Sequence, residues 1–269
     1  MNGADLAALR DLDDELRDVG ALAPDDSLSR HLVDRPLIGS QNCQNPVSLF
    51  VEAGRVVALQ LRDCGLGDIP ESLWRLDQLR SLNLAENQIQ TVSDEIGRLQ
   101  QLTMLDLGHN QIAALPESIG ELRSLRGYLY VSHNRLIMLP NSIGQLAKLG
   151  YLNIGNNQLV FLPDSLGAMS ALRDLRVQHN QLNELPASIR RLSQLCSLNL
   201  RGNRFEHLPE LSALTSLQHL DVRANQLETL PDWIGELPNL LDLDVRWNRL
   251  TSIPEWLNRL DSLGCTVHV

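Results

Sequence analysis

The chain has 269 residues, a formal net charge of −10 and a pI near 5.1. This acidic balance argues against non-specific binding to nucleic acid and against binding to an anionic membrane surface. Leucine accounts for 56 residues while aromatic residues make up only 4% of the chain, which indicates one packing unit used repeatedly rather than a mixed globular core.

The first 55 residues lack the sequence pattern that fills the rest of the chain. Leucines from Leu6 to Leu16 fall at helical spacing, and Gly20 is expected to end that helix. Further on, SLFVEAGRVVAL predicts two short strands around a tight turn at Glu52-Ala53-Gly54. We interpret residues 1–55 as an N-terminal cap made of a helix and short strands. A targeting or injection signal at the start of the chain is an alternative that is compatible with capping.

From Val56 onward the pattern L-x-x-L-x-L-x-x-N-x-L-x-x-L-P recurs nine times. Successive ninth positions are 23 residues apart, except for one interval of 24, from Asn110 to Asn134, and one of 22. A fixed period of this length is the signature of a repeat architecture, in which each unit buries its apolar face against its neighbours. The ninth positions are Cys64, Asn87, Asn110, Asn134, Asn157, Asn180, Asn203, Asn225 and Asn248.

The repeat LTMLDLGHN shows what each position is expected to do. Leu105 and Leu107 are two residues apart and share one face of a strand, while Asp106 lies on the other face. The leucines should point inward and stack on their equivalents in the next repeat. The side-chain amide of Asn110 is expected to bond with buried backbone where the chain turns away, so the asparagines would form a ladder. Residues 118–122 predict a short helical turn beyond it.

This pattern resembles the leucine-rich-repeat family, from Val56 to about Leu263. The 23-residue length and the tail LPESIGELRSL are similar to a branch that includes Ras-suppressor-type proteins, plant intracellular Ras-group repeat proteins and repeat effectors of plant-pathogenic bacteria. The resemblance implies an α/β solenoid that is curved, with a parallel β-sheet on its concave face and short helical or 3₁₀ turns on its convex face. We expect nine repeats over residues 56–262 and a closing strand over residues 263–269.

Positions 3, 5, 7 and 8 of the repeat are left exposed on the inner face of the predicted sheet. All three tyrosines of the chain, Tyr128, Tyr130 and Tyr151, occupy such positions. Because tyrosine joins a large contact area to a polar tip, we predict that they form a binding hot spot, with tyrosines merely tolerated on a wet sheet as the alternative. The extra residue of the 24-residue interval, Gly127, predicts a bulge that re-aims the tyrosines, and a neutral insertion is the alternative.

A second cluster of exposed positions lies in the C-terminal half of the chain. Position 7 is arginine in three successive repeats, aspartates occupy neighbouring positions 3 and 5, and a tryptophan follows the last arginine. Two interpretations stay open: mutual salt bridging across the strands, or a docking patch for an acidic or charged segment of a partner. The candidate contact residues are Arg176, Arg201, Arg223, Arg246 and Trp247.

Motifs for catalysis or for metal binding are missing from the sequence. It contains no nucleophile elbow, P-loop, HExxH or kinase signature, and its four cysteines form no CxxC pair. His109, His133 and His179 share position 8, but no carboxylate completes a set at ligand spacing. We therefore predict no catalytic residue, no metal site and no cofactor.

The predicted function is a non-enzymatic module that binds a protein partner on the concave face, through the tyrosines, the arginines and Trp247. The alternative is the substrate-recognition part of a larger bacterial effector, such as a ubiquitin ligase, without its catalytic domain. The acidic N-terminus has no secretory signal and no apolar run reaches the length of a membrane span, so a soluble protein is expected. It would be cytoplasmic, or delivered into a host cell if it is an effector. We expect a monomer, although Val267 and Val269 offer a strand edge to a second copy.

Overall fold

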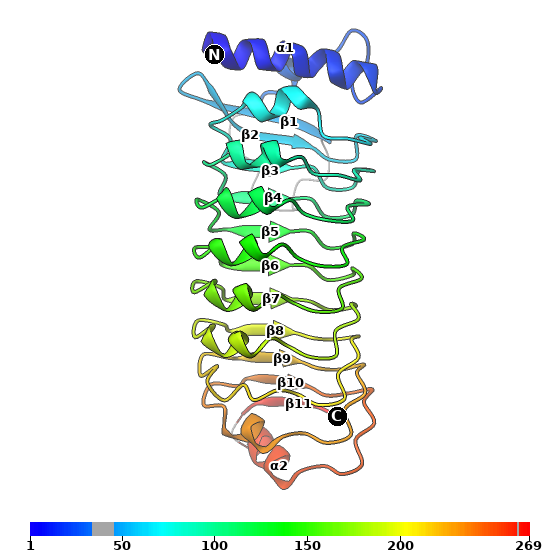
Figure 1. The fold of residues 1–269 in the computed structure, drawn as a ribbon, viewed down its shortest axis with the longest axis vertical. Helices are drawn as coiled ribbons and strands as arrows, with labels where there is room; N and C mark the ends of the chain where they lie inside the picture. The colour runs from blue at the N-terminus through cyan, green and yellow to red at the C-terminus, as the bar shows by residue number, and fades with distance from the viewer. Residues whose placement is uncertain (34–45, 263) are drawn as a thin grey trace. The chain divides into compact units, whose positions relative to one another are not determined.

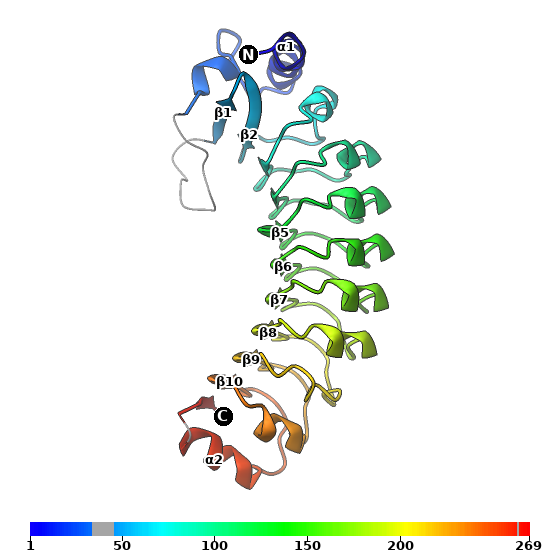
Figure 2. The ribbon, with the colours of Figure 1, turned by 90° about the vertical axis from the view of Figure 1, so that its left-hand side faces the viewer.

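The computed structural model describes residues 1–33, 46–262 and 264–269. The chain forms two compact units, Met1–Arg135 and Leu136–Val269. Each unit has its strands on one side and its 3₁₀ turns (η) on the other (Figures 1 and 2), so the predicted α/β leucine-rich-repeat solenoid is confirmed within each. Of the helices in the described ranges, none combines the length and the apolar character that crossing a membrane requires.

The first unit begins with a helix and a hairpin, and regular repeats follow. Strand β1 is antiparallel to β2, and β2 to β5 then pair in parallel in the order of the sequence. The elements are α1 (Gly3–Asp18), η1 (Leu28–His31), β1 (Val47–Glu52), β2 (Arg55–Leu61), η2 (Glu71–Arg75), β3 (Ser81–Asn83), η3 (Asp94–Arg98), β4 (Met104–Asp106), η4 (Glu117–Glu121) and β5 (Tyr128–Tyr130).

A buried carboxylate fastens helix α1 to the hairpin. Asp5 is fully buried, and its side chain accepts hydrogen bonds from the backbone N–H of Val56 at 2.7 Å and from Nε of Arg55 at 2.9 Å. The hairpin turns at Ala53 and Gly54, both with positive φ, which is the backbone that a two-residue turn between twisted strands requires. The predicted helix and both predicted strands of this segment are thus confirmed. Residues 34–45 lie outside the described residues.

The second unit contains parallel strands only. Strands β6 to β11 pair in sequence order, and the last regular repeat is followed by a short α-helix that the sequence did not predict. The elements are η5 (Asn141–Gln145), β6 (Tyr151–Asn153), η6 (Asp164–Ala168), β7 (Asp174–Arg176), η7 (Ala187–Arg191), β8 (Ser197–Asn199), β9 (His219–Asp221), η8 (Asp232–Glu236), β10 (Asp242–Asp244), α2 (Glu255–Ser262) and β11 (Thr266–His268).

The buried asparagines form the predicted ladder. In the second unit, Asn180 donates from Nδ2 to the carbonyl oxygens of Ile154 and Val177, both at 3.0 Å, and its Oδ1 accepts from the N–H of Leu159 at 2.9 Å. Asn87 makes the equivalent set of bonds in the first unit. Because these backbone groups are buried, each asparagine satisfies polar groups that would otherwise be costly to bury.

A glycine in the outer turn lets the next repeat approach closely. A Cβ built on Gly167 would lie 2.4 Å from the carbonyl oxygen of Ser188, and one on Gly144 would lie 2.2 Å from that of Ser165. Arginine occupies the same position in one repeat only, at Arg190, and the repeat after it has no 3₁₀ turn. Glycine thus fits where the next turn approaches closely, and at Arg190 the 22-residue repeat has no outer turn to meet. The first repeat differs, because Trp74 occupies this position although η3 follows it.

Candidate functional site

The open face of the sheet carries the side chains at repeat positions 3, 5, 7 and 8. Position 8 has a special backbone, because all nine residues there have φ between 51° and 65°. In this left-handed region Asn, Asp, His and Gly are tolerated best, and a bulky residue is an outlier. The position is occupied by Asp63, Glu86, His109, His133, Asn156, His179, Gly202, Ala224 and Trp247.

Tryptophan is therefore the bulkiest residue held in this backbone at position 8. Trp247 has a φ of 57° and is 64% exposed, so neither backbone preference nor core packing explains a tryptophan at this position. Left-handed strain at a bulky residue costs about 1–2 kcal/mol and persists where the surroundings or the function hold it. Trp247 is the strongest single indication of a binding surface on the open face.

Three arginines surround this indole ring and form, together with it, the Trp247 cluster. The guanidinium carbons of Arg201, Arg223 and Arg246 lie 5.8, 6.0 and 5.4 Å from the ring centroid, within the range of cation–π attraction. Strands β8, β9 and β10 each end two residues before one of these arginines, so position 7 of three successive repeats brings them together. The sequence predicted the arginine ladder but not its convergence on Trp247.

Aspartates neutralise two of these arginines but not the third. Arg223 pairs with Asp221 and with Asp244, each at 3.1 Å, and Arg246 pairs with Asp244 at 2.6 Å. In the described part of the chain Arg201 has no carboxylate partner, and its Nε is buried without a hydrogen bond. Salt bridging across strands thus accounts for part of the ladder, while Arg201 acts on Asp221 only through its charge.

The two aspartates of this cluster respond differently to their surroundings. Burial raises the pKa of Asp221, and the hydrogen bond from the Arg223 N–H only partly opposes this. Burial also acts to raise the pKa of Asp244, but hydrogen bonds from Arg246 and the charge of Arg223 outweigh it, so that the pKa lies below its ordinary value. Asp244 is consequently held as a carboxylate between two arginines.

The remaining two candidates of the second unit form a separate contact. The guanidinium of Arg176 lies 5.0 Å from the centroid of the Tyr151 ring, on the neighbouring strand. Arg176 also pairs with Asp174 at 3.3 Å, through an exposed and hence weak ion pair. This pair lies on the same open face as the Trp247 cluster but two repeats before Arg223.

In the first unit, the two candidate tyrosines stack on each other. The ring centroids of Tyr128 and Tyr130 are 4.4 Å apart, with 20° between the ring planes. Both side chains are half-buried. Side chains two apart along a strand point to the same face, but such close stacking was not predicted from the sequence. The predicted hot spot joining them to Tyr151, in the second unit, stays a prediction.

Gly127 is accommodated as a bulge at the entrance to β5. At other strand entries, the residues at positions 2 and 3 both donate to one carbonyl of the preceding repeat, as Arg173 and Asp174 do to Gly150. In this repeat the N–H groups of Arg126 and Gly127 donate to the Thr103 carbonyl instead, so both donors lie one residue earlier relative to the repeat asparagine. Regular pairing with β4 resumes at Leu129. A Cβ on Gly127 would lie 2.8 Å from Cγ of Met104 and 3.0 Å from the Thr103 carbonyl, so glycine fits best. That the bulge serves binding stays a prediction.

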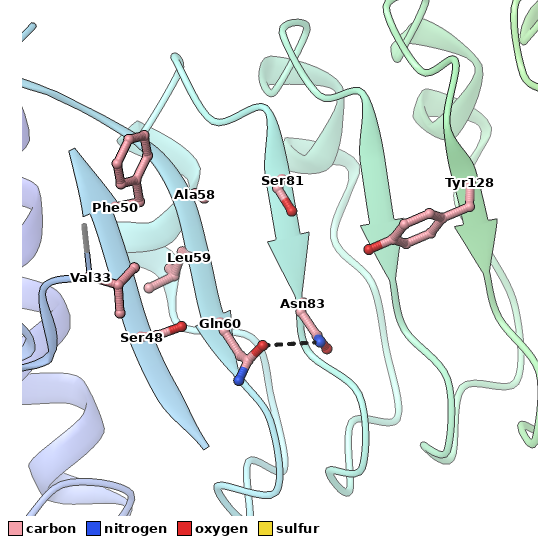
Figure 3. Close-up of a pocket in the computed structure, with 9 residues that line it drawn as sticks. All are labelled: Val33, Ser48, Phe50, Ala58, Leu59, Gln60, Ser81, Asn83 and Tyr128. Atoms are coloured by element: carbon pink, nitrogen blue, oxygen red, sulfur yellow. Dashed lines mark hydrogen bonds between the residues drawn. The ribbon is translucent and has the colours of Figure 1, made fainter. Parts of the chain in front are cut away.

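Tyr128 forms one wall of a hollow in the open face of the first unit (Figure 3). Its ring reaches back from β5 toward β3, and Phe50 on β1 stands on the other side. The small residues Ala58 and Ser81, at position 3 of two successive repeats, lie between these aromatic walls. At its lower edge, Asn83 donates to Gln60 at 3.5 Å. Phe50 was not predicted from the sequence, because it belongs to the cap rather than to a repeat.

A polar hollow lies beside it, at the ends of β3 and β4. It is lined by Arg62, Glu86, Asp106, His109 and Tyr130, among others. A hydrogen bond from Arg62 holds the pKa of Glu86 below its ordinary value, whereas burial raises the pKa of Asp106. The rings of His109 and His133 stack at 3.9 Å. No group of three or more metal-ligating side chains is arranged to hold an ion in the described ranges.

Comparison with known proteins identifies the repeat. A family model described as a leucine-rich repeat region matches residues 38–149, and two further leucine-rich-repeat models match residues 127–182 and 216–237. No curated protein matches the sequence at a significant level.

Several solved structures are similar to this chain. A leucine-rich-repeat protein of Leptospira interrogans is 33% identical over 74% of this chain and 50% of its own, with a TM-score of 0.70. The LRR ectodomain of the Arabidopsis thaliana membrane receptor kinase GASSHO1/SCHENGEN3, in complex with CASPARIAN STRIP INTEGRITY FACTOR 2, is 30% identical over 75% and 25%, with a TM-score of 0.66. The plant peptide hormone receptor RGFR1, in complex with RGF2, is 27% identical over 75% and 37%, with a TM-score of 0.61. This chain spans half or less of each of them.

Proposed function

This chain is a leucine-rich-repeat protein, and on that premise we propose that it binds another protein through the open face of its sheet. Families built on this repeat are typically binding modules rather than catalysts. Two of the similar structures are plant receptors that hold a ligand, which supports a binding role for this chain. The proposal concerns which residues of this chain make the contact and which partner chemistry they favour.

The observation that carries the proposal is Trp247. An exposed tryptophan in a left-handed position is costly for a monomer, because water contacts the indole and the backbone is strained. Tryptophan and arginine are the residues most enriched among the hot spots of protein interfaces. A tryptophan ringed by Arg201, Arg223 and Arg246 therefore has the composition of an interface anchor.

The charges around Trp247 favour an acidic segment of the partner. Arg223 and Arg246 already share the carboxylate of Asp244, whereas Arg201 forms no ion pair among the described residues. An incoming Asp or Glu side chain would give the Arg201 guanidinium its missing carboxylate, in a two-pronged geometry that arginine suits. The apolar part of the same segment would cover the indole ring.

The tyrosines of the first unit supply a second predicted contact. The hollow between Tyr128 and Phe50 is shallow, so we propose that a partner would contact the aromatic rings at its rim rather than fill it. Tyr151, stacked against Arg176, would contribute from the second unit. In this proposal the Trp247 cluster confers charge selectivity, and the tyrosines add contact area.

Affinity capture from cell lysate, followed by titration of the captured partner, tests the proposal. The wild type is compared with Trp247→Asn, Arg201→Gln and the triple variant Tyr128→Ala/Tyr130→Ala/Tyr151→Ala. We expect Trp247→Asn and Arg201→Gln each to weaken binding at least about tenfold, as expected for hot-spot residues. The triple variant should weaken binding as well, with less dependence on salt.

Arg249→Gln serves as the matched control, because Arg249 is exposed but follows the repeat asparagine and lies outside the open face. Asparagine suits the left-handed backbone, so Trp247→Asn should leave the free energy of unfolding within about 1 kcal/mol of the wild type. A partner bound equally well by Trp247→Asn, Arg201→Gln and the wild type would show that the Trp247 cluster is not the binding site.

A further inference from the structure

The edge of the second unit, away from the open face, carries an apolar patch. Positions 12 and 13 of the repeat follow the asparagine turn and are exposed in every repeat of this unit. In two adjacent repeats these positions hold Ile137 (57% exposed), Met138 (46%), Val160 (51%) and Phe161 (46%). Single exposed apolar residues need no explanation, but four on neighbouring repeats mark a surface that excludes water when covered.

The backbone places these residues side by side. The N–H of Gln158 donates to the carbonyl of Leu136 at 2.8 Å, so the segment with Val160 stacks directly on the segment with Ile137. The bond from Gln181 to Leu159, also 2.8 Å, extends the stack to the next repeat. The four apolar side chains are thus one patch rather than separate exposures.

The same two positions change from apolar to acidic in the following repeats. After Val160 and Phe161 come Asn183 and Glu184, then Glu206 and His207. A hollow lies at this point of the edge, lined by Glu184, Arg204, Glu206 and His207 among others. It falls at the 22-residue repeat, where the outer 3₁₀ turn is missing. The edge therefore continues from an apolar patch into a hollow with two carboxylates and one guanidinium, that of Arg204.

From this arrangement we propose a second docking surface at positions 12 and 13, separate from the open face. Its occupant is a segment of another protein that carries large apolar side chains followed by lysine or arginine. The apolar residues cover Met138 and Phe161, and the basic residues meet Glu184 and Glu206 in the hollow. A membrane fits this surface less well, because anionic lipid would be repelled by the two carboxylates.

Two labelled peptides of equal length test the proposal by fluorescence anisotropy with the full chain. One carries three leucines followed by three lysines, and the other has glutamates in place of the lysines. The lysine peptide should bind at least about tenfold more tightly than the glutamate peptide, and its affinity should fall as salt is added. Equal binding of the two peptides, or no binding of the lysine peptide, overturns the proposal.

Variants locate the peptide on the edge. Val160→Ser/Phe161→Ser should abolish binding of the lysine peptide, and Glu184→Lys/Glu206→Lys should reverse the preference in favour of the glutamate peptide. Leu241→Ser is the control, since Leu241 is a similarly exposed leucine (51%) outside positions 12 and 13. Circular dichroism confirms that each variant is folded. Retention of binding by the serine double variant overturns the proposal.

Two further measurements exclude other occupants. If the apolar patch instead pairs two copies of this chain, the molar mass by light scattering will be that of a dimer and will fall to a monomer in Val160→Ser/Phe161→Ser. If it contacts lipid, the wild type will sediment with anionic vesicles and the double variant will not. Either result contradicts the proposed occupant. Because Trp247 and Arg201 lie on the open face, their variants should leave the affinity for the lysine peptide unchanged.

Discussion

The ninth and eighth positions of the repeat are adjacent in sequence, but they behave in opposite ways. The ninth is asparagine in eight of nine repeats, and seven of these asparagines are buried. Its side chain bonds to the backbone of its own repeat and of the neighbouring one, as Asn180 shows. The eighth always has a left-handed backbone, yet its side chain changes from one repeat to the next. The ninth position thus connects neighbouring repeats. At the eighth position the backbone conformation is constant, whereas the side chain differs from repeat to repeat.

The contrast separates positions that serve the repeat from positions that serve one place in the protein. A residue that recurs with the period serves the stacking that every repeat shares. A residue that departs from its column without a structural reason, as Trp247 and Phe161 do, indicates a property of one place in the molecule. Each of the following experiments compares two residues at equivalent or adjacent positions, so that the shared backbone contribution cancels.

The largest expected effect on stability is at Asn157, the second asparagine of the pair Asn156-Asn157. Asn157 donates to the carbonyl of Ile154 at 3.1 Å and accepts from the N–H of Leu136 at 3.0 Å. Asn157→Ala leaves these buried groups without partners and should lower the free energy of unfolding by about 3 kcal/mol. Urea unfolding followed by circular dichroism measures this change.

Asn156→Gly is the matched control, because Asn156 has φ of 54° and glycine adopts that backbone readily. Its free energy of unfolding should stay within about 0.5 kcal/mol of the wild type. Similar losses in both variants would mean that the eighth position carries structural bonds as well, and the contrast between the two positions would be wrong.

A smaller effect is expected at the glycine of the outer turn. Gly167→Ala places a Cβ 2.4 Å from the carbonyl oxygen of Ser188, so the next turn must shift, and we expect a loss of about 2 kcal/mol. Arg190→Ala, at the equivalent position before the repeat that lacks a 3₁₀ turn, should be close to neutral. Thermal unfolding of both variants makes the comparison, and a tolerated Gly167→Ala would show that contact between turns does not select glycine.

The smallest effect is expected at two aspartates that share position 5. Burial raises the pKa of Asp106, while Arg246 and Arg223 hold the pKa of Asp244 below its ordinary value of 3.8. At neutral pH, Asp106→Asn should therefore stabilise the protein slightly, and Asp244→Asn should destabilise it. Asparagine already accepts the equivalent N–H bond at this position in other repeats, as Asn83 does from Ala85, so Asp106→Asn keeps that bond. Asp244→Asn also replaces the oxygen that accepts from Arg246 and Arg223, which adds to its destabilising effect.

The pH dependence of these two variants follows from the direction of each shift. A raised pKa means that the folded state holds the proton longer, so Asp106 reduces stability as the pH rises above 3.8. A lowered pKa means that Asp244 adds stability above 3.8 and loses it as the pH falls through the lowered value. Unfolding measured from pH 2 to pH 7 should show both differences shrinking in acid, and two differences of the same sign would contradict the assignment.

The sequence determined the solenoid through its period. Leucines and asparagines recurring every 23 residues predicted the strands, the buried ladder and the outer turns, because each repeat must present the same groups to its neighbour. The cap was predicted from helical spacing and from one turn. Helix α2 was not predicted, because residues 255–262 follow the pattern of an outer turn, whereas the structure has a helix there that packs against η8 and β11.

For the candidate sites, the sequence placed the tyrosines, the arginines and Trp247 on one face, since side chains alternate along a strand. It did not show that three guanidinium groups converge on one indole, or that Arg201 forms no ion pair among the described residues. It also did not show that Phe50 of the cap faces Tyr128 across a hollow. Nor did it separate Ile137 and Phe161 from the buried residues around them. Both properties depend on how neighbouring repeats stack. Stacking determines which side chains about 23 residues apart make contact and how much of each remains exposed to water, and this can be read only from the tertiary structure.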